Sequence, residues 1–234
     1  MKLPSKVYHS RFDKLKYNII SKIYSFYWVF KEKSISAMIR VKNGEEFLKE
    51  SIESIISVCD EVVIINNRST DKTSEVIKGL QRLYSKKIKV YKYDHDVTKV
   101  GEDSYDLYKI DPKSPKLTHN FYNWCLEKTS YPFILKWDDD MIATDELIKS
   151  IISFKRSKYL QYNFGGVNVA PDHKSSYQWH AGSEPRISPK FLSTYKYSDY
   201  NFVEGSFGGE YIEQWVSCKE VLIKKDSGYL HLKY

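Results

Sequence analysis

Three consecutive aspartates, Asp138, Asp139 and Asp140, are the clearest candidates for chemistry in this chain of 234 residues. They follow the apolar run 133–137, which predicts a buried strand. Grouped carboxylates repel one another, so the cluster is costly unless a cation joins it. A hard divalent cation such as Mg²⁺ or Mn²⁺ takes oxygen ligands and commonly keeps phosphate and water in its other positions. The triplet predicts a metal site on Asp138 and Asp140, which project in similar directions in an extended turn; the alternative is a solvated acidic turn.

Other apolar runs also end in polar turns. Residues 35–41 predict a strand that ends in Lys42-Asn43-Gly44, and residues 61–65 predict a second strand that ends in a polar turn. A third strand is predicted over 88–93. Helices between these strands make them parallel βαβ units, and ligands in such sheets bind beyond the carboxyl ends of the strands. We therefore expect one rim to hold the turns at 40–45, 66–71 and 94–101.

Hydrophobic spacing predicts the elements around this rim. Helices are expected over 44–57, with Asn43 as its cap, then from the 66–71 turn to about residue 84, and over 118–128 and 144–155. The polar stretch 94–115 is typical of a loop. The stretch 165–207 is rich in Gly, Ser, Pro and aromatic residues, which favours a binding surface over a sheet. The predicted fold class is α/β, a Rossmann-like, mostly parallel sheet flanked by helices.

Several segments resemble the family 2 glycosyltransferases, which have the GT-A fold. Residues 35–43 and 61–71 resemble the family's opening strand–helix–strand, which ends in a V-D-N/D-G-S-T-D-like turn. Residues 122–126 resemble a family helix with an R-N-x-G-L-like pattern, and Trp137-Asp138-Asp139-Asp140 stands at the place of the D-x-D metal motif. The resemblance covers residues 34–155 and implies a GT-A-like fold. Two later segments also look like the family, Glu184-Pro185-Arg186 and His231-Leu232-Lys233.

The resemblance implies an inverting, metal-dependent enzyme of polysaccharide biosynthesis. It would move a sugar from a nucleotide-sugar, commonly a UDP-sugar, to a hydroxyl of a glycan or lipid-linked acceptor, with Mn²⁺ or Mg²⁺ bridging the diphosphate. Asn66 departs from the family by replacing an aspartate that faces the base. Arg68 replaces a glycine, and its guanidinium group would face either phosphate or solvent. The donor-binding residues carried over are Arg40, Lys42, Asn43, Asn66, Asn67, Asp71 and Asp138.

An inverting transferase also needs a carboxylate that takes the proton of the acceptor. Glu204 and Glu210 are candidates because they flank a Gly-Ser-Phe-Gly-Gly stretch suited to a lid. Glu184 is a third candidate, for which an acceptor contact or a structural ion pair is the alternative. At the other end of the second half, the resemblance implies that His231 completes the metal shell and that Lys233 neutralises the diphosphate; the alternative is a frayed tail.

The net charge of +7 is concentrated at the N-terminus, since residues 1–33 contain eight Lys or Arg and two acids. Apolar residues recur there at spacings of three and four, which predicts an amphipathic helix. Such a helix either lies on an anionic membrane or packs on the surface of the protein's own domain. The stripe consists of Phe12, Leu15, Ile19, Ile23, Tyr27 and Phe30.

We therefore predict an N-terminal appendage over 1–33 and one GT-A-like domain over 34–234, with a nucleotide-sugar half (34–140) and an acceptor half (141–234). Three widely spaced cysteines and the lack of a secretory signal favour the cytoplasm, with possible peripheral contact to the inner face of a membrane through residues 1–30. The alternatives are a nucleotidyltransferase that makes nucleotide-sugars and a noncatalytic basic protein that binds membranes or nucleic acid. The nearly neutral body and the absence of a nucleic-acid motif argue against a nucleic-acid partner.

Overall fold

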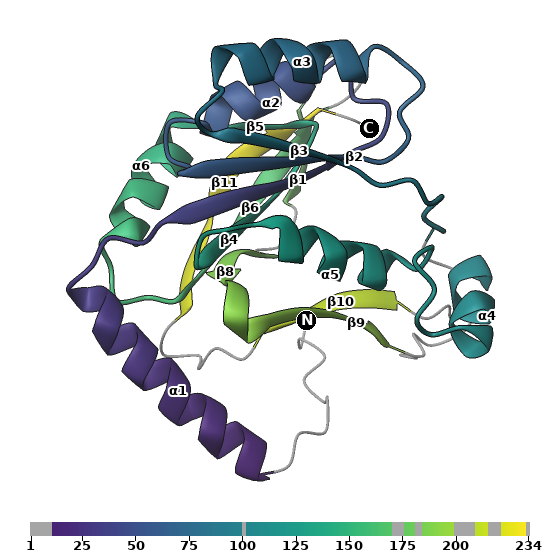
Figure 1. Ribbon diagram of the computed structural model, residues 1–234. Helices are drawn as coiled ribbons and strands as arrows, with labels where there is room; N and C mark the ends of the chain where they lie inside the picture. The colour runs from purple at the N-terminus through teal and green to yellow at the C-terminus, as the bar shows by residue number, and fades with distance from the viewer. Residues whose placement is uncertain are drawn as a thin grey trace.

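The computed structural model describes residues 11–99, 102–169, 176–180, 184–198, 209–214 and 221–232. Its first four strands are β1 (Ile35–Val41), β2 (Glu61–Asn66), β3 (Ile88–Lys92) and β4 (Phe133–Asp138). They are mutually parallel and adjacent in the order β3-β2-β1-β4 (Figure 1). The apolar runs of β1, β2 and β4 are buried on both faces, as expected for a parallel sheet covered by helices, whereas β3 at the edge exposes Lys89 and Lys92. The α/β class and the four strands predicted in this half are confirmed.

The second half of the chain adds five more strands to the same sheet. The full order is β3-β2-β1-β4-β8-β6-β11-β5, with β7 paired to β6. The expectation that 165–207 is a binding surface rather than a sheet was wrong for its described residues, because they include part of β6 and all of β7 and β8. The five are β5 (Met141–Ala143), β6 (Gln161–Val169), β7 (Ser176–His180), β8 (Glu184–Pro189) and β11 (Val221–His231). A separate two-stranded sheet joins β9 (Ser193–Ser198) and β10 (Gly209–Gln214).

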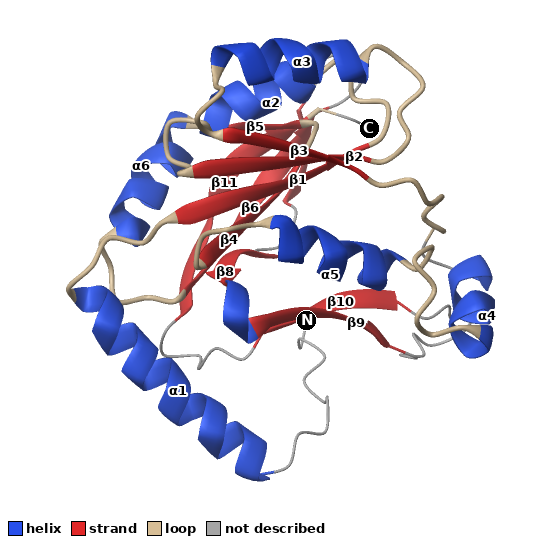
Figure 2. Ribbon diagram, viewed as in Figure 1, coloured by secondary structure: helices blue, strands red, loops and turns tan. Residues whose placement is uncertain are grey.

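Helices cover both faces of the sheet (Figure 2). On one face lie α2 (Leu48–Ile55), α3 (Thr73–Leu83) and α6 (Asp145–Lys155), and on the other lies α5 (Thr118–Lys128). Two predictions need correction. The helix expected from residue 44 begins at Leu48 with Phe47 at its N-cap, so Asn43 does not cap it. The stretch 94–115, predicted as a loop, contains α4 (Glu102–Ile110), whose nine residues are too polar to show a clear apolar stripe.

Side chains along β1 alternate between two hydrophobic cores. Ala37, Ile39 and Val41 join the larger core with α2, α3 and α6, whereas Met38 joins the smaller core under α5. This alternation follows from the two-residue period of a strand. It places Arg40, the next residue of the same parity as Met38, on the α5 face.

The N-terminal helix α1 (Arg11–Val29) packs against the domain, but by an unexpected face. Trp28 and Ser25 are buried, and the Ser25 hydroxyl donates to the Lys158 carbonyl at 2.7 Å. Trp28 packs edge-on against Phe133, with ring centroids 5.2 Å apart. By contrast, residues of the predicted apolar stripe are exposed where they are described, as Ile23 illustrates. The prediction of a helix is confirmed. Its contact with the domain is made by the face with Ser25 and Trp28 and not by the predicted apolar stripe.

Within the part of the chain that is described, none of the helices combines the length and the apolar character needed to cross a bilayer. Cys59 and Cys125 are free and buried, which agrees with their expected structural role, and Cys218 lies outside the described residues. The division at residues 33 and 34 remains a prediction.

Candidate functional site

The strand ends of the parallel half form the predicted rim. Arg40 lies opposite Asp138 in the β1–β4 pairing, and Val41 lies opposite Asn66 in the β1–β2 pairing. Lys92 at the end of β3 pairs with Asn66, which brings the third turn to the same edge. The shared rim is therefore confirmed for the turns as far as they are described.

A cleft of about 390 Å³ opens at this rim. It is lined by acidic residues from the β4–β5 turn and basic residues from the end of β1, and α5 supplies aromatic residues. Six of the predicted site residues line this cleft, namely Arg40, Lys42, Asn67, Asp138, Asp140 and His231.

Asp138 is held by two buried arginines. Its Oδ1 accepts a hydrogen bond from Arg40 Nη2 at 2.5 Å, and its Oδ2 accepts one from Arg186 Nη1 at 3.1 Å. Burial alone would raise the pKa of Asp138, but the nearby charges of Arg40, Lys136 and Arg186 outweigh it and hold the pKa far below its usual value. Asp138 is thus a permanently ionised carboxylate with both oxygens engaged. As a metal ligand it remains a prediction.

Tyrosines fix the orientation of both arginines. The Arg40 guanidinium lies 4.1 Å from the centroid of the Tyr122 ring, a cation–π contact from α5. Arg186 Nη2 donates to the Tyr229 hydroxyl at 2.9 Å. Sequence reasoning gave no role to Arg186, Tyr122 or Tyr229. The only signal was that Arg186 belongs to a family-like Glu-Pro-Arg segment and Tyr122 to the family-like helix.

Asp140 and His231 meet at the other side of the cleft. The pairing of β11 with β5 sets Met141 opposite His231, and the Leu232 amide donates to the Asp140 carbonyl at 2.9 Å. As a result, His231 Nε2 lies 3.1 Å from Asp140 Oδ1. The Asp140 carboxylate raises the pKa of His231 above its ordinary value, against the opposing effect of partial burial.

The same ring is held from its other side, since His231 Nδ1 lies 3.1 Å from Asn168 Oδ1. Asp140 Oδ1 is buried and has no well-directed hydrogen bond among the described residues. A buried carboxylate oxygen next to an imidazole nitrogen suits a divalent cation. Within the described ranges no group of three or more His, Cys, Asp or Glu side chains is arranged to hold a metal, so these residues offer at most a pair.

Asn43 and Asp71 lie outside this cleft, along a second hollow of about 290 Å³ that also reaches Asp139 and Asp140. Asn43 Oδ1 accepts a hydrogen bond from the Thr70 amide at 2.8 Å, and Asp71 Oδ2 accepts one from the Glu45 amide at 3.1 Å. These bonds join the turn after β1 to the turn after β2. The two side chains therefore hold the rim together in this structure.

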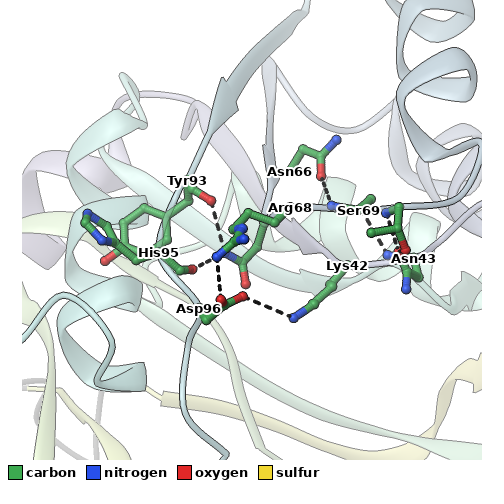
Figure 3. Close-up of polar contacts among 10 residues, drawn as sticks. Lys42, Asn43, Asn66, Arg68, Ser69, Tyr93, His95 and Asp96 are labelled. Carbon is green, nitrogen blue, oxygen red and sulfur yellow. Dashed lines mark hydrogen bonds and ion pairs between the residues drawn. The ribbon is translucent and has the colours of Figure 1, made fainter.

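The two asparagines after β2 are also engaged. Asn67 donates both amide hydrogens, to the carbonyls of Tyr93 at 3.1 Å and His95 at 2.8 Å, and so ties the chain after β3 to the rim. Asn66 Oδ1 accepts from the Ser69 amide at 3.0 Å (Figure 3). Asn66 borders a third hollow of about 170 Å³ rather than the main cleft.

Arg68 stands in a left-handed backbone conformation, with φ of 55°. Glycine adopts this conformation without strain, which explains why the family usually has glycine here. The Arg68 guanidinium forms an ion pair with Asp96, and Lys42 Nζ lies 3.8 Å from the same carboxylate (Figure 3). The three side chains are about half exposed; Lys42 lines the cleft, whereas Arg68 borders the third hollow. The sequence left phosphate or solvent as the alternatives for the Arg68 guanidinium. In the structure it contacts a carboxylate, that of Asp96.

The structure describes the candidate bases and Lys233 only in part. Glu184 is the first residue of β8 and Glu210 lies in β10, opposite Tyr197, but their side chains lie outside what the structure describes. Glu204 and Lys233 lie outside the described residues altogether. The choice of catalytic base remains a prediction.

Residues 36–101 match the family model described as glycosyl transferase family 2. Over these residues the match agrees with the family resemblance stated from the sequence. Together with the parallel β3-β2-β1-β4 sheet it agrees with the expected GT-A-like fold. No curated protein matches the chain.

Two solved structures have a partial likeness to the chain. TarS of S. aureus is 19% identical with a TM-score of 0.46, over 68% of this chain and 29% of TarS. Glucosyl-3-phosphoglycerate synthase from Mycobacterium tuberculosis, in complex with Mn²⁺, uridine diphosphate and phosphoglyceric acid, is 13% identical with a TM-score of 0.41, over 68% of this chain and 57% of that protein. The chain thus spans well under two thirds of either protein.

Proposed function

We propose that this chain, whose residues 36–101 match family 2 glycosyltransferases, transfers a sugar from a nucleotide-sugar donor, a UDP-sugar, to an acceptor hydroxyl. One observation carries the proposal: the β4–β5 turn and the end of β11 bring Asp140 and His231 to 3.1 Å beside the turns that match the family. The nucleotide would lie along Lys42 and Asn67, which line the cleft. Its diphosphate would point toward Asp140.

Asp140 and His231 are the residues proposed to hold Mn²⁺ or Mg²⁺. Such an ion needs only one or two protein ligands when phosphate and water complete its shell, which suits a pair. When bound, it neutralises the charge that develops on the leaving nucleoside diphosphate. The His231 ring is oriented by Asn168, so its nitrogen is already directed toward Asp140.

Asp138 is proposed to act on the cleft through the arginines. Its carboxylate holds Arg40 and Arg186 side by side at the carboxyl end of β4. Of the two arginines, Arg40 lines the cleft, where its positive charge counters the charge of the neighbouring aspartates and favours an anionic donor. Asp138 is therefore a positioning residue, and its second predicted role as a metal ligand would require it to give up one arginine.

We propose an inverting reaction, in which a carboxylate removes the acceptor proton while the acceptor oxygen forms the new bond and the nucleoside diphosphate leaves. Glu204, Glu210 and Glu184 are the candidates for this base. The acceptor is proposed to be a glycan or lipid-linked glycan, and the protein to act in the cytoplasm at the inner face of a membrane. A lipid-linked acceptor would require the domain to work close to a bilayer.

The test is to incubate the protein with a panel of nucleotide-sugars and Mn²⁺, and to measure nucleoside diphosphate release. Slow release from at least one UDP-sugar is expected, because water can replace the acceptor. Binding of the same donor, measured by calorimetry, should depend on Mn²⁺. Absence of binding for every donor contradicts the proposal. Release of pyrophosphate from a nucleoside triphosphate and a sugar phosphate would identify a nucleotidyltransferase instead.

The metal pair is tested with Asp140→Asn and His231→Ala. Each should weaken Mn²⁺-dependent donor binding by about tenfold or more, equivalent to about 1.4 kcal/mol, while the thermal unfolding midpoint changes little. The matched control is Asp106→Asn, which removes an exposed carboxylate on α4. Full Mn²⁺-dependent binding in both variants would remove the metal assignment.

A further inference from the structure

Helix α1 presents its apolar side chains to solvent. Ile19, Ile23, Phe26 and Phe30 are spaced three or four residues apart and form one line, here called the outer line. Ile23, Phe26 and Phe30 are 67%, 68% and 73% exposed. A helix that packs on a domain normally buries its apolar line and exposes its serines. In α1 this arrangement is reversed, because the face that packs on the domain contains Ser21 and Ser25.

The apolar surface extends to both sides of the outer line. Tyr27 and Val29 on the same helix are 46% and 50% exposed. Next to α1, Phe191 is 53% exposed and contacts Tyr24 edge-on, with ring centroids 4.4 Å apart. Contiguous exposed apolar residues of this kind mark an interaction site rather than ordinary scattered surface residues.

The charge of the N-terminal segment indicates which kind of partner this surface binds. Residues 1–33 contain eight basic and two acidic residues, whereas the rest of the chain is nearly neutral. Lys22 and Lys31 are exposed beside the outer line. One of the eight does not contribute to the surface, since the Lys33 ammonium is buried and donates to the Phe154 carbonyl at 3.3 Å. The remaining basic residues favour an anionic partner and oppose a second copy of the same basic segment.

The position of α1 leaves the cleft open. Trp28 packs on Phe133, the first residue of β4, whereas Asp138, the last residue of β4, lines the cleft. The two sites are therefore at opposite ends of one strand, separated by about 17 Å at the rise of a strand. Figure 1 shows α1 at the lower left of the view, away from α2 and α3 at the top.

We infer that the outer line of α1 binds an anionic membrane surface, with its apolar side chains in the lipid interface and the exposed Lys22 and Lys31 near the lipid headgroups. This is the arrangement of a helix that lies in the plane of a membrane. The inference is independent of the catalytic proposal, because it uses a different surface. It narrows the possible membrane contact of residues 1–30 to one face of one helix.

The experiment measures cosedimentation of the full chain with vesicles of phosphatidylcholine plus phosphatidylglycerol and with vesicles of phosphatidylcholine alone. Strong binding is expected only with phosphatidylglycerol present, and added NaCl should weaken it. The double variant Ile23→Asp and Phe26→Asp should lower the apparent vesicle affinity by more than about tenfold. The control is the single variant Leu83→Asp, because Leu83 on α3 is as exposed as Ile23, at 67%. This variant should bind the vesicles as the parent does.

Equal binding by parent and double variant, or no binding by the parent, overturns the inference. A parent that is dimeric by light scattering without lipid, and a double variant that is monomeric, also overturns it in favour of a second copy. Nucleoside diphosphate release from a soluble donor should be the same in the parent and the double variant. Loss of vesicle binding with intact release, and the reverse result in Asp140→Asn, separate this inference from the proposed catalytic function.

Discussion

The left-handed backbone conformation at Arg68 costs conformational free energy. Its φ of 55° is unfavourable for any residue with a Cβ atom. Its ion pair with Asp96 is about half exposed, and such pairs contribute little to stability. Arg68 therefore occupies this turn beside the third hollow against its own backbone preference, and such strained residues are common near functional sites.

Two replacements of Arg68 separate the backbone strain from the contribution of the ion pair. Arg68→Ala removes the ion pair but keeps the strain, whereas Arg68→Gly removes both. We expect the glycine variant to have a free energy of unfolding about 1 kcal/mol higher than the alanine variant, measured by urea denaturation. Equal stability of the two variants, or a more stable alanine variant, would show that the conformation carries no strain.

The acidic triplet shows how neighbouring residues acquire different roles. Asp138 is neutralised by two arginines and Asp140 faces His231. Asp139 lies near the other hollow, where a Cβ atom on Gly44 would come within 2.6 Å of its carboxylate. Each carboxylate thus has a different environment, and Asp140 is the one seen next to an imidazole. The proposed metal site therefore centres on Asp140.

At the scale of elements, Glu61 joins β1, β2, β3 and the turn before β4. Its carboxylate accepts hydrogen bonds from Ser36 at 2.6 Å and from the Ser130 amide at 2.8 Å, and it pairs with Lys89 at 2.6 Å. Burial alone would raise the pKa of Glu61, but the hydrogen bonds from Lys89, Ser36 and Ser130 outweigh it and lower the pKa below 4.5. The unfolded chain therefore binds a proton at Glu61 more readily than the folded protein does.

The sign of the pH dependence follows from this lowered pKa. The contribution of Glu61 to stability is fully present above about pH 4.5 and is lost as the pH falls through the folded pKa. At neutral pH, Glu61→Gln should lower the free energy of unfolding by about 2 kcal/mol. Urea denaturation of parent and variant should show this difference shrinking as the pH falls below about 4.5. A difference that stays constant with pH would contradict the assignment.

The contact of β6 with β11 depends on a glycine. A Cβ atom on Gly166 would lie 2.4 Å from the ring of Tyr229, whose hydroxyl accepts the hydrogen bond from Arg186. Gly166→Ala should therefore lower the free energy of unfolding by about 2 kcal/mol and also weaken donor binding. Thermal unfolding and calorimetry measure the two effects.

Gly79→Ala provides the control for Gly166. Gly79 lies in α3, and nothing would contact its Cβ atom within 4 Å. This change should raise the free energy of unfolding by up to about 1 kcal/mol, because alanine favours a helix. If both variants are equally stable, the contact of Gly166 with Tyr229 is not a constraint on the sheet.

At the scale of the whole molecule, α1 is part of the packed structure as well as a candidate contact surface. Trp28 belongs to the larger hydrophobic core together with Phe133 and Phe154. Deleting residues 1–30 would therefore expose core as well as remove the outer line, so point variants are the cleaner test of membrane binding. The molecule thus has its polar cleft at one end of β4 and its apolar surface at the other.

The packing role of α1 predicts a large effect at one position. Trp28→Ala should lower the free energy of unfolding by about 3–4 kcal/mol, since it leaves a cavity beside Phe133. Phe26→Ala, on the exposed face, should change it by less than about 0.5 kcal/mol. Chemical denaturation of both variants measures the contrast. Similar costs at the two positions would show that α1 packs differently.

The sequence by itself determined the parallel half of the fold and the place of the site. Apolar runs such as 61–65 and the polar turns that follow them predict strands and a rim, because these patterns depend on neighbours two to four residues away. The family resemblance also predicts Asp140 and His231 as metal ligands, and in the structure the two side chains lie 3.1 Å apart. Short, polar α4 and the later strands lack such patterns, which is why they were missed.

Only the tertiary structure decided which partners the site residues have. Asp138 finds Arg40 and Arg186, which are 98 and 48 residues away along the chain, and no local pattern encodes such a contact. The same holds for α1, whose spacing predicts an apolar line but cannot say which face meets the domain. Trp28 and Ser25 pack against it because Phe133 and the Lys158 carbonyl lie there. Side-chain roles are set by chain-distant neighbours, and those become known only when the sheet is assembled.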